Sequence, residues 1–542
     1  MDILTNQKYS GFIVSGISLS PDVDEKEACA LAASELKRAG ISPARLHFNV
    51  YKRSVDARKK KDIRIVYSVA ARFDIPRETA LPKSSKYRIA LLESEELEVV
   101  KGSERMSAPP LVVGMGPAGL FAALLMAENG YAPVIIDRGD CIEQRNKSYE
   151  RFSKFGILDT ESNIQFGAGG AGTFSDGKLL TRINDAKIGY VLKRFCDFGA
   201  PEEIQVAAKP HIGTDLLLGI VDKMLMRIEE LGGRVMYRTR LDDIRELFDG
   251  NIAAVTSKGE IVCSSVLLAT GHSARDTYAM LLDRGFAVEA KSFSVGVRIE
   301  HLREDIDRAL YGDMAGHPAL GKGEYHLSDT SSGRGVYTFC MCPGGEIVAA
   351  ASEEGGVVVN GMSRNARDGR NSNSAVAVSV TKSDYDGTPM GAIEFQRKIE
   401  RAAFKEGGSD YRAPVMTVGD LLSGRTGTDP RRVLPTYRDG MVRTADMNKV
   451  LPSFVIDELR RGLVSFDRKL AGFASPDAVI TGAETRTSAP VRIMRGEDLR
   501  AVGKGRIYPC GEGAGYAGGI TSAAIDGIRV ALKIMEQFAP AD

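Results

Sequence analysis

Several features that would place this chain in a specialised class are missing from its sequence. Its 72 Lys and Arg nearly balance 71 Asp and Glu, so a net charge of +1 provides no overall field for nucleic acid or anionic lipid. No apolar run reaches the roughly 18 residues that a membrane helix needs, and the N-terminus lacks the pattern of a signal peptide. Seven scattered cysteines, an odd number, favour a reducing compartment over a disulfide scaffold. We therefore expect a soluble, cytoplasmic protein.

The motifs of several enzyme classes are missing as well. The sequence has no cluster with metal-ligand spacing, no Ser/His/Asp order and no phosphate loop ending in Gly-Lys-Ser/Thr, and we expect no metal. Glycine, in contrast, is abundant at 58 residues. It concentrates at 114–119, 167–177, 344–361 and 511–519, and such clusters are typical of loops where the backbone meets a ligand.

The stretch from 109 to 137 has the pattern of strand, tight turn, helix and strand. Leu111-Val-Val is a short apolar run of the kind that forms a buried parallel strand. Gly114, Gly116 and Gly119 follow in GxGxxG spacing, which permits a sharp turn, a close approach to a phosphate and close packing of the helix. Asp137, about 20 residues further on, can accept both ribose hydroxyls of an adenosine. These features predict a dinucleotide site, and its residues are Gly114, Gly116, Pro117, Ala118, Gly119, Asp137 and Arg138.

Two other glycine-bearing segments are expected near that site. Gly167-Ala-Gly-Gly-Ala-Gly172 repeats the GxGxxG spelling, but a poor strand precedes it and no acidic strand end follows it. We interpret it as a flexible loop whose N–H groups line a cofactor bound elsewhere. Val266-Leu-Leu-Ala-Thr-Gly271 is a further buried strand that ends at a ligand-facing turn.

The remaining pattern predicts three domains. Residues 1–105 form a small N-terminal α/β domain of ferredoxin-like type, with strands near 12–17, 45–51 and 63–71 and a helix over 24–40. Residues 106–290 and 482–542 form a discontinuous nucleotide-binding domain. Residues 291–481, with short strands and a hairpin about Pro343-Gly-Gly, form an inserted β-rich substrate domain, to which 151–205 is a further candidate contribution.

The N-terminal domain contains a basic run, Lys52 to Lys61, between two of its expected strands. It is either a solvated hairpin tip or a contact for RNA or an acidic partner. No aromatic residue within the run is available to stack on bases, so nucleic acid is not the expected partner.

Three segments together resemble the two-domain, FAD-binding flavoproteins: 114–137, Ala269-Thr-Gly271 and Cys510-Gly-Glu-Gly-Ala-Gly-Tyr-Ala-Gly-Gly519. Further stretches, such as Gly169-Gly-Ala-Gly-Thr-Phe-Ser-Asp-Gly-Lys178, are similar to a bacterial group of uncharacterised FAD-dependent dehydrogenases over nearly the whole chain. The resemblance implies an α/β, Rossmann-like FAD-binding domain and supplies no substrate. It adds these cofactor residues: Gly170, Ala171, Gly172, Lys178, Ala269, Thr270, Gly271, Gly511, Glu512, Gly518, Gly519 and Ile520.

Candidate catalytic residues lie in the expected substrate domain. Cys340 and Cys342 are two apart on an expected strand, so both face the same side, either as small packed hydrophobes or in a redox or substrate role. His301, which follows Arg298, is either a proton donor or a structural histidine, and both residues are catalytic candidates. Arg486 and Arg492 flank Thr-Ser-Ala-Pro and either hold an acidic substrate or form salt bridges.

These observations favour an FAD-dependent oxidoreductase that transfers a hydride or electrons between flavin and a small organic substrate. The alternative is a flavin-containing binding or redox-sensing protein that engages RNA or a protein partner through the basic N-terminal hairpin. Gly513-Ala-Gly-Tyr-Ala-Gly518 has the GxGxxG spelling, but the chain ends before a second strand can follow it. We therefore expect no second nucleotide domain, although NAD(P)H can still dock directly beside the flavin.

Overall fold

The computed structural model describes residues 9–93, 97–181, 183 and 185–540, and its contacts divide the chain into two units. Unit 1 joins Met1–Glu98 to Asn184–His211 and Asp307–Gly323. Unit 2 comprises Val99–Ile183, Ile212–Ile306 and Glu324–Asp542. Two segments from far along the chain thus belong with the N-terminal region, which composition alone did not indicate.

Unit 1 contains a four-stranded antiparallel sheet in the order β2-β3-β1-β4, with one helix between the first two strands. This is the expected ferredoxin-like strand order, although the connection 78–87, all of it described, forms no second helix. The helix α1 begins where the Asp24 carboxylate accepts the Lys26 N–H, and it buries its Ala28, Ala32 and Leu36 stripe. The bounds are β1 (Tyr9–Leu19), α1 (Glu25–Arg38), β2 (Leu46–Asp56), β3 (Arg64–Arg77), β4 (Arg88–Glu93) and α4 (Lys187–Asp197).

The two later segments complete the core of unit 1. Tyr311 and Leu320 are buried in the same apolar cluster as Phe12 of β1. Arg53 of β2 donates to the Ala319 carbonyl at 2.9 Å, and its backbone N–H donates to the Val206 carbonyl at 2.7 Å. Strand β2 therefore extends through much of the basic run, which leaves only its second half in the turn. The strand expected over 45–51 is thus longer than predicted, and only residues 57–63 form the turn of the hairpin.

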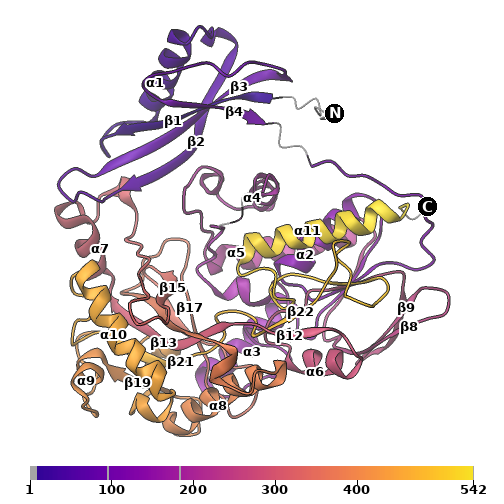
Figure 1. Ribbon diagram of the computed structural model, residues 1–542, viewed down its shortest axis with the longest axis vertical. Helices are drawn as coiled ribbons and strands as arrows, with labels where there is room; N and C mark the ends of the chain where they lie inside the picture. The colour runs from indigo at the N-terminus through magenta and orange to yellow at the C-terminus, as the bar shows by residue number, and fades with distance from the viewer. Residues whose placement is uncertain (1–8, 94–96, 182, 184, 541–542) are drawn as a thin grey trace. The chain divides into compact units, whose positions relative to one another are not determined.

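Unit 2 is built around a five-stranded parallel sheet in the order β23-β11-β5-β6-β7. Helix α2 follows β5 and packs against both α11 and α5 (Figure 1). The approach of α11 is close, since a Cβ added at Gly527 would lie 2.0 Å from the Ala118 carbonyl oxygen. The predicted Rossmann-like fold is confirmed. Its elements are β5 (Leu111–Val113), α2 (Pro117–Glu128), β6 (Val134–Ile136), α5 (Thr214–Glu230), β7 (Arg234–Met236), β11 (Val266–Leu268), β23 (Ile507–Pro509) and α11 (Ile520–Gln537).

A second, seven-stranded sheet of unit 2 has the order β14-β15-β18-β13-β21-β19-β20 and is antiparallel except for its last pair. Helices α8 and α10 pack against its strands, so this region has long helices as well as the expected strands. Its elements are β13 (Phe293–Leu302), β14 (Ser328–Asp329), β15 (Val336–Cys342), β18 (Asn371–Val380), α8 (Pro389–Gly407), β19 (Ala413–Thr417), α9 (Val418–Ser423), β20 (Val442–Thr444), α10 (Ser453–Lys469) and β21 (Val479–Glu484). Helix α7 (Arg303–Tyr311) begins in unit 2 and, from Asp307 on, belongs to unit 1.

Smaller elements connect these sheets. One is a three-stranded sheet in the order β10-β9-β8. The expected hairpin about Pro343 was wrong, because β15 and β16 belong to different sheets. The strands are β8 (Leu241–Glu246), β9 (Ile252–Thr256), β10 (Gly259–Cys263), β12 (Val288–Ala290), β16 (Glu346–Ala349), β17 (Val359–Met362) and β22 (Val491–Ile493). The remaining helices are α3 (Ile142–Phe155) and α6 (Arg275–Asp283), with short 3-10 turns such as η2 (Gly170–Phe174). Within the described ranges, no helix has the length and apolar character needed to cross a bilayer.

Candidate functional site

An open cavity of unit 2 lies at the carboxyl ends of the parallel strands. Its volume is about 300 Å³, at the lower end of the roughly 300–1,000 Å³ that is typical of a small-molecule site. Most of the predicted cofactor residues line it, although the sequence scatters them over four segments. They are Gly114, Gly116, Pro117, Ala118, Asp137, Gly170, Ala171, Gly172, Lys178, Ala269, Thr270, Gly271, Gly511, Glu512, Gly518, Gly519 and Ile520.

The three glycines of the first motif have the different roles that the sequence predicted. Gly114 adopts a φ of 106°, and an added Cβ would lie 2.2 Å from the Ala269 carbonyl oxygen, so the turn itself requires glycine. A Cβ at Gly119 would lie 1.9 Å from the Gly114 carbonyl oxygen, inside the fold and away from the cavity. At Gly116 an added Cβ would meet no described atom within 4 Å. The bare backbone of Gly116 thus faces open space at the N-terminus of α2, where a diphosphate fits.

Asp137 links the two glycine-rich loops. Its carboxylate accepts the N–H groups of Met115 at 2.9 Å and of Gly139 and Gly167 at 2.8 Å each. These bonds take most of its acceptor capacity. Its expected bonds to ribose hydroxyls stay a prediction.

The loop after Asp137 is fixed by Arg145, which sequence analysis missed. This α3 side chain is fully buried. Burial lowers the pKa of its guanidinium, but the group remains protonated at neutral pH. Its bonds show that the loop expected to be flexible is clamped by one cation. The acceptors are the carbonyls of Asn163, Ile164, Ala168 and Gly170 and the hydroxyl of Thr173.

Replacing Arg145 by methionine is expected to weaken FAD binding strongly, because four carbonyls lose a buried donor at about 1–3 kcal/mol each. The matched control is Arg151→Met, an exposed position on the same helix. The flavin-to-protein ratio and the dissociation constant for FAD measure the effect. Equal affinities of the two variants would contradict the role given to Arg145.

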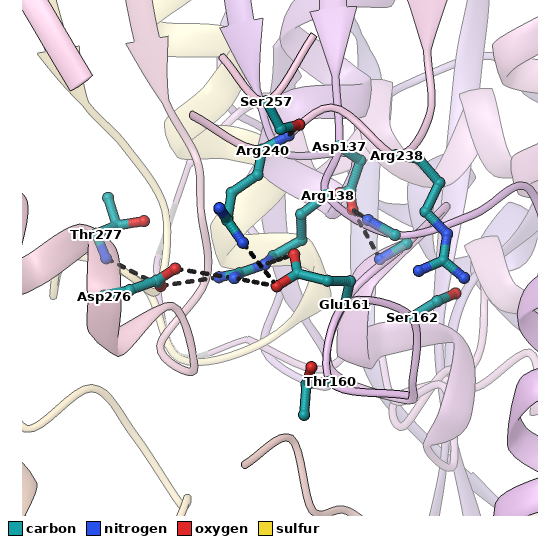
Figure 2. A network of polar contacts seen from close by, with 12 residues as sticks. Asp137, Arg138, Thr160, Glu161, Ser162, Arg238, Arg240, Ser257, Asp276 and Thr277 are labelled. Atoms are coloured by element: carbon teal, nitrogen blue, oxygen red, sulfur yellow. Dashed lines mark hydrogen bonds and ion pairs between the residues drawn. The ribbon is translucent and has the colours of Figure 1, made fainter. Parts of the chain in front are cut away.

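Arg138 belongs to a charged network beside the nucleotide end of the cavity (Figure 2). It binds Glu161 at 2.9 and 3.0 Å and Asp276 at 2.8 Å through two nitrogens, and it lies 4.5 Å from the Phe166 ring centroid. Burial by itself lowers the pKa of Arg138, but the two carboxylates outweigh burial and raise it. Arg138 lines a smaller pocket next to Asp137 and Phe166, so it forms the wall of the site with its donors already engaged.

The predicted catalytic residues occupy different environments. Cys340 lines the cavity, whereas Cys342 is fully buried behind it. Arg298 is also buried and reaches Asn360, Asn373 and Glu484. The His301 Nε2–H donates to the Phe473 carbonyl, 2.7 Å away, and the two rings are tilted against each other with their centroids 4.9 Å apart, as expected of a structural histidine.

A β-bulge explains why the two cysteines differ. Phe339 pairs with Ala375 and Cys342 with Asn373, so two residues of β15 face one residue of β18. The prediction that both cysteines face the same side assumed an unbroken strand, and the bulge interrupts that alternation, so that Cys340 lines the cavity while Cys342 is buried.

A buried ionic cluster supports the floor of the cavity. Glu400 of α8 binds Arg275 at 2.7 and 2.9 Å and Arg486 at 3.1 and 3.2 Å. Arg486 also donates to Ser273 at 3.0 Å, and both residues line the cavity. Of the two roles considered for Arg486, holding an acidic substrate or forming salt bridges, the structure shows salt bridges. Arg492, in turn, donates to the Gly515 carbonyl at 3.2 Å.

Sequence reasoning missed several lining residues because they come from strands and loops without a glycine motif. They are Gln165, Phe166, Ser175, Asp176, Leu180, Ser273, Phe339, Asn360, Glu484, Thr487 and Ala523.

Comparison with known proteins identifies the family. A model described as "FAD-dependent protein, C-terminal domain-like" matches residues 292–487, and a domain of unknown function matches residues 14–72. An uncharacterised protein of Clostridium beijerinckii is 45% identical over 534 residues, which cover 97% of this chain and 98% of that protein. This chain belongs to the FAD-dependent protein family. The protein binds FAD, and the open backbone at Gly116 fits the diphosphate of that cofactor.

Solved structures that are similar to this chain include flavoproteins. A halogenase in complex with FAD is 10% identical, with 79% of this chain and 69% of that chain covered and a TM-score of 0.40. A glycine oxidase from Geobacillus kaustophilus is 11% identical, with 81% and 97% covered and a TM-score of 0.33. Because these scores are low, the fold assignment rests on the chain's own strand order.

Proposed function

We propose that this protein is an oxidoreductase that transfers a hydride or electrons between flavin and a small organic substrate. One observation carries the proposal: a single cavity joins the nucleotide-binding turns to Cys340, Asn360 and Glu484, which come from the second sheet and its neighbouring strands. When bound, FAD supplies hydride and electron chemistry, and the protein has to bind, orient and tune it.

Two features near the last glycine motif support a redox site. Helix α11 begins at Ile520 after a glycine N-cap, and the positive end of its dipole favours negative charge in the cavity. Glu512 also lines the cavity, and burial raises its pKa to about 7, against the smaller opposite effect of Lys291. Glu512 is therefore suited to hold or release a proton near neutral pH.

An anaerobic titration of the purified yellow protein tests this function. NADH, NADPH and a metabolite panel are added separately while the visible absorbance of oxidised flavin is recorded. We expect one of them to bleach the flavin and an electron acceptor to restore the colour. Dithionite is the control, because it shows whether the flavin can be reduced at all. Reduction by dithionite alone would contradict the oxidoreductase proposal.

The alternative, a binding or sensing protein, depends on the basic run of unit 1. Lys59, Lys60 and Lys61 are exposed in the turn between β2 and β3. Arg58, however, pairs with Asp56 at 2.5 Å, and Arg53 is bonded within its own unit. Fewer free cations thus remain than the sequence indicated, and this observation favours the oxidoreductase.

A further inference from the structure

The bulge in β15 turns Cys340 toward the cavity and keeps Cys342 directly behind it. Cys340 has a φ of 43°, a left-handed conformation that a side chain other than glycine seldom adopts. Such conformations persist only where surrounding contacts hold them, and they gather at functional sites. Both cysteines are free thiols.

Two cations hold this segment in place. Arg298 donates to the Cys340 carbonyl and approaches the Cys342 sulfur at 3.5 Å, while Lys178 donates to the Met341 carbonyl. The Cys342 sulfur lies 3.3 Å from the Cys340 carbonyl oxygen. Packing of two small hydrophobic residues would require neither the bulge nor the buried cation Arg298.

The two thiols have opposite acidities. A hydrogen bond from Cys342 lowers the pKa of the Cys340 thiol to about 6, and the charges of Arg298 and Lys178 add to this effect against burial. Burial is the main reason why the pKa of Cys342 lies well above its usual range. A partly exposed, acidic thiol that lines a cavity, next to a buried thiol that stays protonated, is the arrangement of an attacking and a resolving cysteine.

We propose that Cys340 and Cys342 form a thiol–disulfide exchange pair and that the substrate class of this cavity is an organic disulfide. The proposal rests on the proposed redox function of the same site. The exposed apolar side chains Phe339 and Leu180 line the cavity and offer contacts to an organic substrate. The lining cation Lys178 is paired with Asp176 at 3.0 Å, and Arg486 is paired with Glu400, so a neutral disulfide fits better than an anionic one.

The exchange balances without another oxidant or reductant. The Cys340 thiolate attacks one sulfur of the substrate, the substrate S–S bond breaks, and the leaving thiolate takes a proton from solvent. Cys342 then gives up its proton, and its sulfur attacks that of Cys340, so the mixed disulfide breaks and the second thiol leaves with a proton. The substrate disulfide is reduced to two thiols, and the two cysteines are oxidised to one intramolecular disulfide.

The test exposes the purified holoprotein to bis(2-hydroxyethyl) disulfide and maps its cysteines by mass spectrometry after acid quench. The peptide with Cys340 and Cys342 is expected to lose two hydrogen atoms, with release of two mercaptoethanol molecules. It should react at least about tenfold faster than the partly exposed Cys29, Cys141 and Cys196, which serve as internal references.

Two variants check the order of attack. Cys342→Ser is expected to trap the mixed disulfide on residue 340, whereas Cys340→Ser should leave this peptide unmodified. Cys263→Ser, at a buried thiol of β10 outside the cavity, should behave like the unsubstituted protein. A Cys340–Cys342 peptide that stays reduced in the unsubstituted protein while the reference cysteines react would overturn the proposal, whatever the variants do.

This readout is independent of flavin reduction. Oxidation of the pair in a protein whose flavin no metabolite reduces would support the exchange pair and contradict the oxidoreductase. If a metabolite reduces the flavin but the cysteine pair does not react, the oxidoreductase is supported and the exchange pair is contradicted.

Discussion

Replacing Gly116 by leucine is expected to give a folded protein that carries no FAD. Gly116 has a φ of −71°, which any residue adopts, and an added Cβ meets no described atom within 4 Å. The fold therefore tolerates the side chain, which instead fills the space that the diphosphate needs at the N-terminus of α2. The flavin-to-protein absorbance ratio and the circular dichroism spectrum measure the two parts of the result.

Two further glycine substitutions serve as controls for this prediction. Gly219→Leu places the same side chain at an exposed helical glycine with open surroundings, and it should leave the protein yellow. Gly114→Leu should instead impair folding, because its φ of 106° and the Ala269 carbonyl at 2.2 Å exclude a side chain. A Gly116→Leu protein that purifies with the full complement of FAD would refute the placement of the diphosphate.

Replacing Glu400 by glutamine is expected to destabilise the protein by about 3–5 kcal/mol, because two buried arginines lose their shared counter-charge. The side chains of Glu400 and Arg275 are 3% and 2% exposed, so water cannot replace the lost partner. Glu394→Gln is the matched control on the same helix, since that residue is 41% exposed and its ion pairs contribute little. Chemical denaturation measures the free energy of unfolding of each variant.

The loss of stability caused by Glu400→Gln should become smaller as the pH falls. Burial by itself raises the pKa of Glu400, but Arg486 and Arg275 outweigh burial and hold the pKa well below the usual 4.5. A carboxyl with a lowered folded-state pKa stabilises the protein fully above its unfolded pKa, and this contribution fades as the pH falls below it. The difference between the wild type and Glu400→Gln should therefore narrow in acid. A difference that is constant or grows below pH 4.5 would contradict the assignment.

The nucleotide side of the site could be predicted because its determinants are local. Gly114, Gly116 and Asp137 lie within one strand-helix-strand unit, where spacing alone fixes which residue turns the chain and which faces the ligand. The description of residues 291–481 as short strands and turns found the strands but missed the long helices α8 and α10, whose amphipathic patterns the glycine-bearing turns around them obscured.

The substrate side could not be predicted, since its geometry depends on distant partners. The period of two along β15 is interrupted at Cys340 by contacts from Arg298 and Lys178, which lie on other elements. The role of Arg145 could not be predicted either. In the sequence it is a charged residue of a polar helix, and the carbonyls that it binds are 18 or more residues away. Whether a cation is buried depends on how the loop folds around it, and the spacing of residues in the sequence does not reveal this.

The division of the chain also bears on how the protein is made. Because Tyr311 and Leu320 belong to the core around Phe12, the first part synthesised on the ribosome cannot complete its own interior until more than half of the chain has emerged. Contacts over such long separations form slowly, and unfinished apolar surface invites aggregation in the meantime. Expression of residues 1–105 alone would leave this interior open.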